Sequence, residues 1–225
     1  ISEDKYSLSI GNIGYVANIR PRIDKGNGWK DFNIGVGYNR LNNFKSTGIM
    51  KVENSSNSQI DYFQFLAQNR TPDNLDGFFE GLAFNTFLID TVPGSPTEYN
   101  RVLFDGDKVN QTKILDEKGH LGEFTLSFGA NYNHKLYLGA TIGIQDINYE
   151  STSEYTEQLV LPEGQSTLDD YTFTQNLKIT GVGINLKIGG IYKATEELRL
   201  GLAIHTPTFW EMSEDYKTEI KAHYA

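Results

Sequence analysis

Apolar residues alternate with glycine and small polar residues along several stretches of the chain. Between Phe124 and Tyr132 every second side chain is apolar or aromatic, and the residues between them are Thr, Ser, Gly and Asn. Successive side chains of a β-strand point to opposite faces, so this period of two predicts a strand with one apolar face and one small, polar face. The stretch 136–145 repeats the pattern after the short link 133–135, which predicts a β-hairpin.

Further stretches have the same period of two. They are 6–19, 32–39, 182–188 and 198–205, so six strands are predicted in all. The alternation changes parity near Gly181, where we expect either a β-bulge or the point at which a strand leaves the membrane. It changes again at Gly11 and Asn12.

Long connections alternate with short ones between these strands. Short links are expected at 133–135 and 194–197, and long excursions at 46–121 and 151–170. Bacterial outer-membrane barrels alternate short periplasmic turns with long outer loops in this way. We therefore expect 46–121 to be a long extracellular loop.

This loop contains the only helical signals of the chain. Apolar residues recur at helical spacing from Tyr62 to Leu66 and from Leu75 to Ala83. A Thr71-Pro72 pair is typical of the start of a helix. Two short amphipathic helices are predicted here.

The pattern indicates an all-β fold, a transmembrane antiparallel β-barrel with short helices in one extracellular loop. No run of about 18 apolar residues exists, which excludes a transmembrane helix. A soluble β-sandwich or lipocalin-like barrel also alternates with period two, but its exposed face typically carries Lys, Glu and Thr. Here the polar face is rich in Gly, Asn and Ser, which favours a membrane barrel.

Composition narrows the possible functions. The formal net charge is −9 and the pI is near 4.9, so the basic surface that binds nucleic acid is missing. The chain has no cysteine, which excludes disulfides and thiolate chemistry. Its four histidines are isolated and it has no Gly-x-Ser-x-Gly motif, so we expect no metal site, no cofactor and no enzymatic activity.

Three segments carry a resemblance to a known family. The stretch from Gly190 to Pro207 resembles the FadL/TodX family of outer-membrane transporters, especially its Bacteroidetes-type members, and 32–40 and 128–140 are similar to the same group. The resemblance implies a monomeric barrel of about 14 strands with an N-terminal plug, hydrophobic cargo such as long-chain fatty acids, and lateral release beside a kinked strand. Six strands are about half of such a barrel, so 1–225 is expected to be part of a single barrel domain. The alternative is that 1–225 is the whole barrel, which would then be smaller, with about eight strands.

Candidate binding residues fall into two sets. Seven apolar residues of the long loop are candidates for capturing a hydrophobic ligand, and the alternative is that they pack the loop against itself and the barrel rim. They are Phe63, Phe65, Leu66, Phe78, Phe79, Leu82 and Phe87. On the polar face, Lys187, Arg199 and His205 are candidates for holding a carboxylate head group, with salt bridges to acidic residues as the alternative.

A third set, Gly11, Asn12 and Gly14, is a candidate for the kinked strand, because glycine and a change of parity interrupt a β-ladder. An irregular strand end explains these residues equally well. We therefore expect passive uptake of hydrophobic compounds by a monomer in outer-membrane lipid. Long-chain fatty acids are the leading cargo, with aromatic hydrocarbons and haem also open. An outer-membrane binding or adhesion protein and a membrane-embedded hydrolase are the alternatives.

Overall fold

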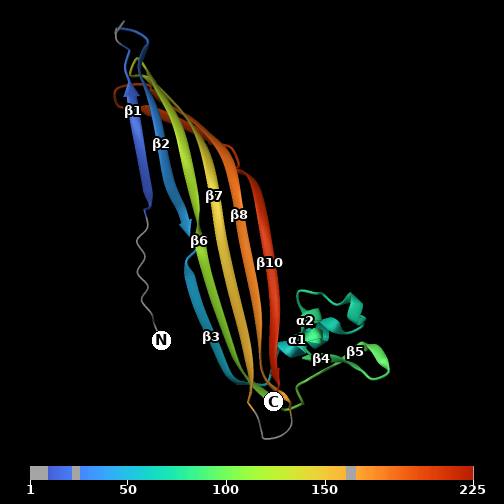
Figure 1. Ribbon diagram of the computed structural model, residues 1–225. Helices are drawn as coiled ribbons and strands as arrows, with labels where there is room; N and C mark the ends of the chain where they lie inside the picture. Colours follow the sequence, from blue (N-terminus) through green and yellow to red (C-terminus); the bar gives the residue numbers. More distant parts are fainter. Residues whose placement is uncertain (1–9, 22–25, 161–165, 225) are drawn as a thin grey trace. The chain divides into compact units, whose positions relative to one another are not determined.

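The described part of the chain folds mostly into β-strands. The computed structural model describes residues 10–21, 26–160 and 166–224. Strands make up 69% of the described residues and helices 9%. Most of the strands belong to one large antiparallel sheet (Figure 1). The all-β prediction is confirmed.

Eight strands form this sheet rather than the six expected. In spatial order the main path is β1 (Asn12–Ile19), β2 (Trp29–Asn43), β6 (Lys108–Tyr132), β7 (Leu136–Val160), β8 (Leu168–Lys193) and β10 (Phe209–Tyr224) (Figure 1). In addition, β3 (Ser46–Ser55) pairs with β6, and β9 (Arg199–His205) pairs with β8. Within the described residues β1 does not pair with β10, so the sheet is open and is not a closed barrel.

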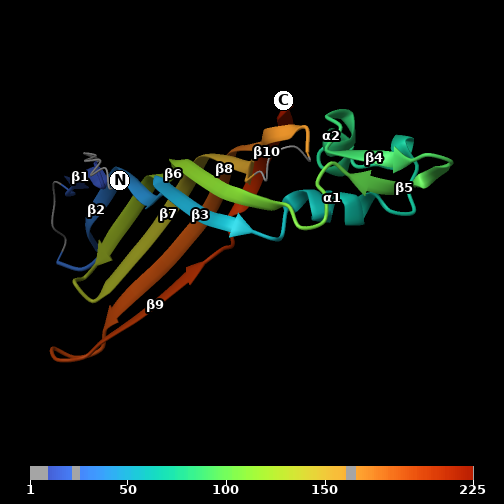
Figure 2. The same ribbon diagram turned by 90° about the horizontal axis from the view of Figure 1, so that it is seen from below.

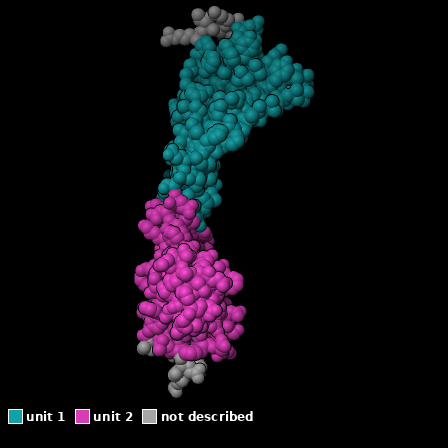
Figure 3. All heavy atoms as spheres, turned by 90° about the vertical axis from the view of Figure 1, so that its right-hand side faces the viewer, with its two compact units in different colours: residues 1–44, 119–149, 179–213 teal, residues 45–118, 150–178, 214–225 magenta. Residues whose placement is uncertain are grey.

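The chain divides into two compact units (Figure 3). Unit 1 comprises residues 1–44, 119–149 and 179–213, and unit 2 comprises residues 45–118, 150–178 and 214–225. The strands β6, β7 and β8 are 25 or 26 residues long, and each contributes residues to both units.

In unit 1 the register places apolar side chains of neighbouring strands on one side of the sheet. Tyr38 on β2 lies opposite Phe124 on β6 and opposite Ile13 on β1. Residues directly opposite each other in an antiparallel pair project to the same side, so these side chains belong to one face, called here the apolar face. Gly35 and Ser127 lie opposite each other on the other side, the polar face. The strands predicted at 32–39, 124–132, 136–145, 182–188 and 198–205 are all confirmed.

Unit 2 contains a layer of short elements. These are α1 (Gln59–Ala67), a 3-10 helix (Pro72–Asn74), α2 (Glu80–Asn85) and the hairpin of β4 (Ile89–Val92) and β5 (Ser95–Arg101), which Figure 2 shows gathered together. Their shared core includes Ile60 and Phe63 of α1 and Tyr171 and Phe173 of β8. The rings of Phe63 and Phe173 meet edge to face with centroids 5.9 Å apart. Helices this short are not stable alone, so aromatic packing is what holds them in place.

The second predicted helix begins later than expected, whereas the helix around Tyr62 to Leu66 is confirmed as α1. Thr71 and Pro72 begin only the 3-10 helix, and α2 starts at Glu80. Between them, the carboxylate of Asp76 accepts a hydrogen bond from the backbone N–H of Phe78 at 2.8 Å. Such a local turn competes with helical hydrogen bonding, which explains why α2 begins only at Glu80.

Two stretches predicted as loops contain regular strand. In 46–121, β3 and the first part of β6 occupy the two ends; in 151–170, β7 continues to Val160 and β8 begins at Leu168. These strand segments carry Lys, Asp, Glu, Thr and Gln among their apolar residues, so no clean apolar alternation marks them in the sequence. The loop boundaries expected there are therefore corrected.

At the change of parity near Gly181, where we expected either a β-bulge or the point at which the strand leaves the membrane, β8 passes from unit 2 to unit 1. β8 runs without a break from Leu168 to Lys193. Phe173 belongs to the buried core of unit 2, whereas Val182 and Ile184 are exposed residues of unit 1. The parity changes because a different side of the strand is apolar in each unit.

Candidate functional site

The apolar face of unit 1 is exposed on every strand that contributes to it. Each of its large side chains listed next keeps more than a third of its surface accessible. They are Ile13, Tyr15, Ile34, Val36, Phe124, Phe128, Leu138, Ile144, Ile184, Ile188, Leu200 and Leu202. Soluble monomers rarely expose a contiguous apolar patch of more than a few hundred Å². Exposed apolar side chains on several neighbouring strands are typical of a surface that contacts apolar groups.

Aromatic pairs lie toward the two ends of this face. Trp29 contacts Tyr132 with ring centroids 5.3 Å apart, and Tyr38 contacts Phe124 at 4.9 Å. At about 3.3 Å per residue, the β2 stretch from Trp29 to Tyr38 spans about 30 Å. With the strand tilt of about 35–45° found in membrane barrels, its height is about 21–25 Å, close to the apolar band of about 25 Å that such barrels present between aromatic girdles.

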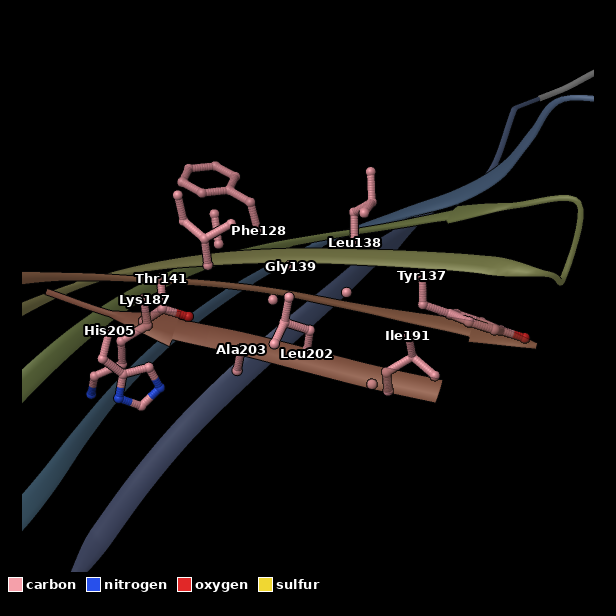
Figure 4. A pocket seen from close by; sticks show the side chains of 15 residues that line it. Phe128, Tyr137, Leu138, Gly139, Thr141, Lys187, Ile191, Leu202, Ala203 and His205 are labelled. Atoms are coloured by element: carbon pink, nitrogen blue, oxygen red, sulfur yellow. The ribbon is translucent and has the colours of Figure 1, made fainter. Parts of the chain in front are cut away.

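A groove of about 570 Å³ runs along β7, β8 and β9 of unit 1 (Figure 4). Lys187 and His205 line it and are register partners on β8 and β9, so their side chains project to the same side of the sheet. Space in the groove comes partly from the absence of side chains at Gly139, Gly189 and Gly201. Of the three predicted cations, Arg199 does not line the groove; it pairs with Lys193 at the beginning of β9.

An ion pair with a buried carboxylate holds Lys187 in the groove. Its ammonium nitrogen lies 2.9 Å from both carboxylate oxygens of Glu123, whose side chain is 5% exposed. The side-chain amides of Gln145 and Asn185 donate to the same carboxylate at 3.1 and 3.3 Å. Gly143 provides the room, because a Cβ at this position would lie 2.6 Å from Glu123 Oε1.

Glu123 was not identified from the sequence. It lies 64 residues from Lys187, and no spacing pattern connects the two. The one sequence signal for Glu123 is its charge, directly before the predicted strand 124–132, whose residues are small and polar or apolar. The ion pair is the alternative that the sequence left open for Lys187.

The residues expected to kink a strand lie in or before a regular ladder. Gly11 precedes β1, while Asn12 pairs with Asn39 and Gly14 with Gly37, with no shift of register through Ile19. The expected kink is therefore not found there. The first part of the strand predicted at 6–19 falls on residues 1–9, outside the described residues. The segment 206–208, which contains Pro207, separates β9 from β10.

The seven apolar candidates of unit 2 separate into two groups. Phe63 is fully buried, and Phe79 and Leu82 pack against the same core, while Leu66 is half-buried. These residues stabilise unit 2, as the alternative interpretation held. In contrast, Phe65, Phe78 and Phe87 are 73%, 53% and 69% exposed. Of the seven candidates, these three are the ones whose side chains are mostly accessible from solvent.

A buried carboxylate, Glu157 on β7, fixes the start of α1. It is 1% exposed and accepts hydrogen bonds from the backbone N–H of Gln59 at 2.8 Å, from Gln111 Nε2 at 3.0 Å and from the Tyr155 hydroxyl at 2.5 Å. The hydroxyl of Ser58, which caps α1, donates to the same carboxylate. Burial, together with this contact, raises the pKa of Tyr155 well above its usual range.

The negative charge of the chain is concentrated in unit 2. This unit contains 20 of the 29 Asp and Glu residues and 10 of the 20 Lys and Arg residues, which gives it a formal net charge of −10. The remaining 9 acidic and 10 basic residues give unit 1 a net charge of +1. The unit with the exposed apolar face is therefore close to neutral, and unit 2 repels anions at long range.

Comparison of the chain with protein-family models, with curated proteins and with solved structures gave no significant match. In the described part of the chain, no helix is long and apolar enough to cross a membrane. Nor do three or more His, Asp or Glu side chains come together there in a geometry that could hold a metal ion.

Proposed function

We propose that unit 1 is embedded in the bacterial outer membrane, as part of a β-barrel that admits hydrophobic compounds, with long-chain fatty acids as the leading cargo. The observation that carries the proposal is the exposed apolar face, about one bilayer in height and bounded by aromatic pairs, opposite a face of small polar residues. The resemblance of 32–40, 128–140 and 190–207 to the FadL/TodX family supports the same assignment.

The open edges of the sheet fit a larger barrel. In lipid, unpaired backbone N–H and C=O groups are too costly, so membrane sheets close on themselves. A barrel of about 14 strands needs more than 225 residues. The proposal therefore assigns the remaining strands to polypeptide outside this sequence.

The groove along β7, β8 and β9 offers a place for the cargo. Ile191 and Ala203 contribute apolar surface to it, and Thr141 and His205 supply polar groups for a carboxyl head group. Glu123 already neutralises Lys187, so the groove binds mainly through apolar contact. On this route the exposed Phe65, Phe78 and Phe87 make the first contact with the ligand.

Filling the groove tests the proposal. In the double variant Gly139→Leu/Gly201→Leu, the new Cβ atoms meet only ordinary van der Waals contacts, at 3.7 Å from the nearest atoms. The full-length protein in liposomes should take up a labelled long-chain fatty acid, and the double variant should reduce uptake to the level of empty liposomes. Gly48→Leu is the matched control, because nothing lies within 4 Å of a Cβ at Gly48.

The outcomes separate the alternatives. Normal uptake by the double variant would exclude the groove as the route. Absence of uptake by the unaltered protein would contradict transport of fatty acids and favour an outer-membrane binding or adhesion protein. A parallel triple variant, Phe65→Ala/Phe78→Ala/Phe87→Ala, should slow uptake, whereas Phe104→Ala, also an exposed Phe of unit 2, should not.

A further inference from the structure

The charge inside the groove along β7, β8 and β9 is set by a residue that does not line it. Of the described residues that line the groove, Lys187 and His205 are the basic ones, and Arg199 lies outside it. Glu123 is not a lining residue either, yet its carboxylate forms the ion pair with Lys187. The head groups that the groove accepts therefore depend on Glu123 as well as on the residues in contact with the cargo.

The fold brings Glu123 to Lys187 across an intervening strand. Glu123 belongs to β6 and Lys187 to β8, and β7 lies between them. Here β7 carries Gly143, where a Cβ would lie 2.6 Å from Glu123 Oε1 and 2.6 Å from Asn185 Oδ1. The missing side chain lets the carboxylate reach the ammonium group, which lies 2.9 Å from both of its oxygens. The positive charge of Lys187 is thus compensated before any cargo arrives.

A cargo carboxylate would gain little from Lys187 in this arrangement. A hydrogen bond from the ammonium group would place an anionic oxygen about 2.9 Å from Nζ. Because the Glu123 oxygens lie 2.9 Å from the same atom, the two anions would be no more than about 6 Å apart. Coulomb energy falls as the inverse of distance, so repulsion by Glu123 cancels about half of the attraction or more. The anion also loses more hydration free energy on entering the groove than a hydroxyl group does.

His205 offers a partner that suits an uncharged head group. It is the register partner of Lys187, and Figure 4 shows both side chains on the same side of the sheet. A neutral imidazole has one donor and one acceptor nitrogen. A hydroxyl group or a protonated carboxyl group likewise donates and accepts, whereas a carboxylate only accepts.

We infer that Glu123 makes the groove selective for cargo with an uncharged head group, such as a long-chain alcohol or the protonated form of a fatty acid. This inference rests on the transport proposed above and adds the residue that determines its head-group specificity. Glu123 acts through Lys187. Without the carboxylate, Lys187 is a cation free to pair with an anionic head group, and the preference should reverse.

Uptake of two ligands with the same alkyl chain tests the inference. Initial rates are measured for labelled palmitate and labelled cetyl alcohol, with liposomes that contain the full-length protein, and uptake by empty liposomes is subtracted. The ratio of the two uptake efficiencies reports the head group alone. We expect the alcohol to be taken up at least as efficiently as palmitate. Glu123→Gln should shift the ratio towards palmitate by about three- to tenfold, less than a full charge-assisted hydrogen bond because Lys187 is 32% exposed.

Two further variants separate charge from structure. Glu123→Gln/Lys187→Met removes both charges, so the ratio should return to that of the unaltered protein. Glu196→Gln is the matched control, because Glu196 is a carboxylate of unit 1 that pairs with Lys193 but is 85% exposed and does not line the groove. A purely structural role of Glu123 would lower the uptake of both ligands and leave their ratio unchanged.

The inference is overturned if the unaltered protein takes up palmitate more efficiently than cetyl alcohol, or if Glu123→Gln leaves the ratio unchanged. In both cases uptake itself persists, so the proposed transport stands. Uptake of neither ligand above the level of empty liposomes would instead contradict the transport and this inference with it.

Discussion

Replacing Glu157 with leucine should destabilise the first turn of α1. Leucine has a similar volume and no charge to desolvate, but it leaves four donors without their acceptor: the Ser58 hydroxyl, the Gln59 N–H, the Gln111 amide and the Tyr155 hydroxyl. At about 1 kcal/mol for each lost hydrogen bond, the loss is about 4 kcal/mol. Relief of the buried charge offsets about 1–2 kcal/mol, so the net loss is about 2–3 kcal/mol.

Hydrogen exchange of peptides from α1, followed by mass spectrometry, measures this loss locally. Both tryptophans, Trp29 and Trp210, belong to unit 1, so their fluorescence is a poor probe of α1. A net loss of about 2–3 kcal/mol should speed exchange of the α1 amides about 30- to 150-fold. Glu154→Leu, at an exposed position on the same strand, is the control and should have little effect. Less than a threefold change in the Glu157→Leu variant would refute the capping role of this carboxylate.

Three further predictions concern single contacts. Lys187→Met should lower the free energy of unfolding, measured with urea in lipid vesicles, by about 3–5 kcal/mol, because Glu123 stays buried without its partner. Adding Glu123→Leu should recover most of this loss. Gly119→Ala should prevent normal folding, measured by circular dichroism, because φ is +129° and the new Cβ would lie 2.0 Å from the Asn148 carbonyl oxygen; Gly48→Ala should be tolerated. Folding raises the pKa of Tyr155, so the stabilisation by its neutral hydroxyl is complete below the unfolded pKa near 10.0 and is lost as the pH rises from there towards the folded pKa. Because Tyr155→Phe removes this titration, alkaline unfolding of unit 2 should shift to higher pH in that variant.

The part of the fold that could be predicted from the sequence is the part with one apolar face. Phe124 to Tyr132 and its neighbours alternate cleanly, because one face of each strand is apolar and the other is small and polar. The strand segments of unit 2 could not be recognised in this way, since charged residues occur on them, as in the stretch from Lys113 to Lys118.

A local sequence signal marks the start of α1. Ser58 followed by Asp61 forms a capping box, and this spacing is a recognised start of a helix, so the beginning of α1 could have been assigned. In contrast, Phe63 and Phe65 look alike in the sequence, yet one is fully buried and the other is 73% exposed. What separates them is packing against Phe173, more than 100 residues away in the chain, which no local pattern contains.

The most direct test of the membrane assignment is the accessibility of consecutive residues on β6. The chain has no cysteine, so single cysteines can be introduced from 124 to 130 and spin-labelled in the protein reconstituted in lipid. Labels at Phe124, Leu126 and Phe128 should be accessible to oxygen dissolved in the bilayer, and labels at Thr125 and Ser127 to a water-soluble nickel complex. This alternation with period two is the predicted result. Equal access of the nickel complex to both sets would show that both faces of the strand are in water and would contradict the account.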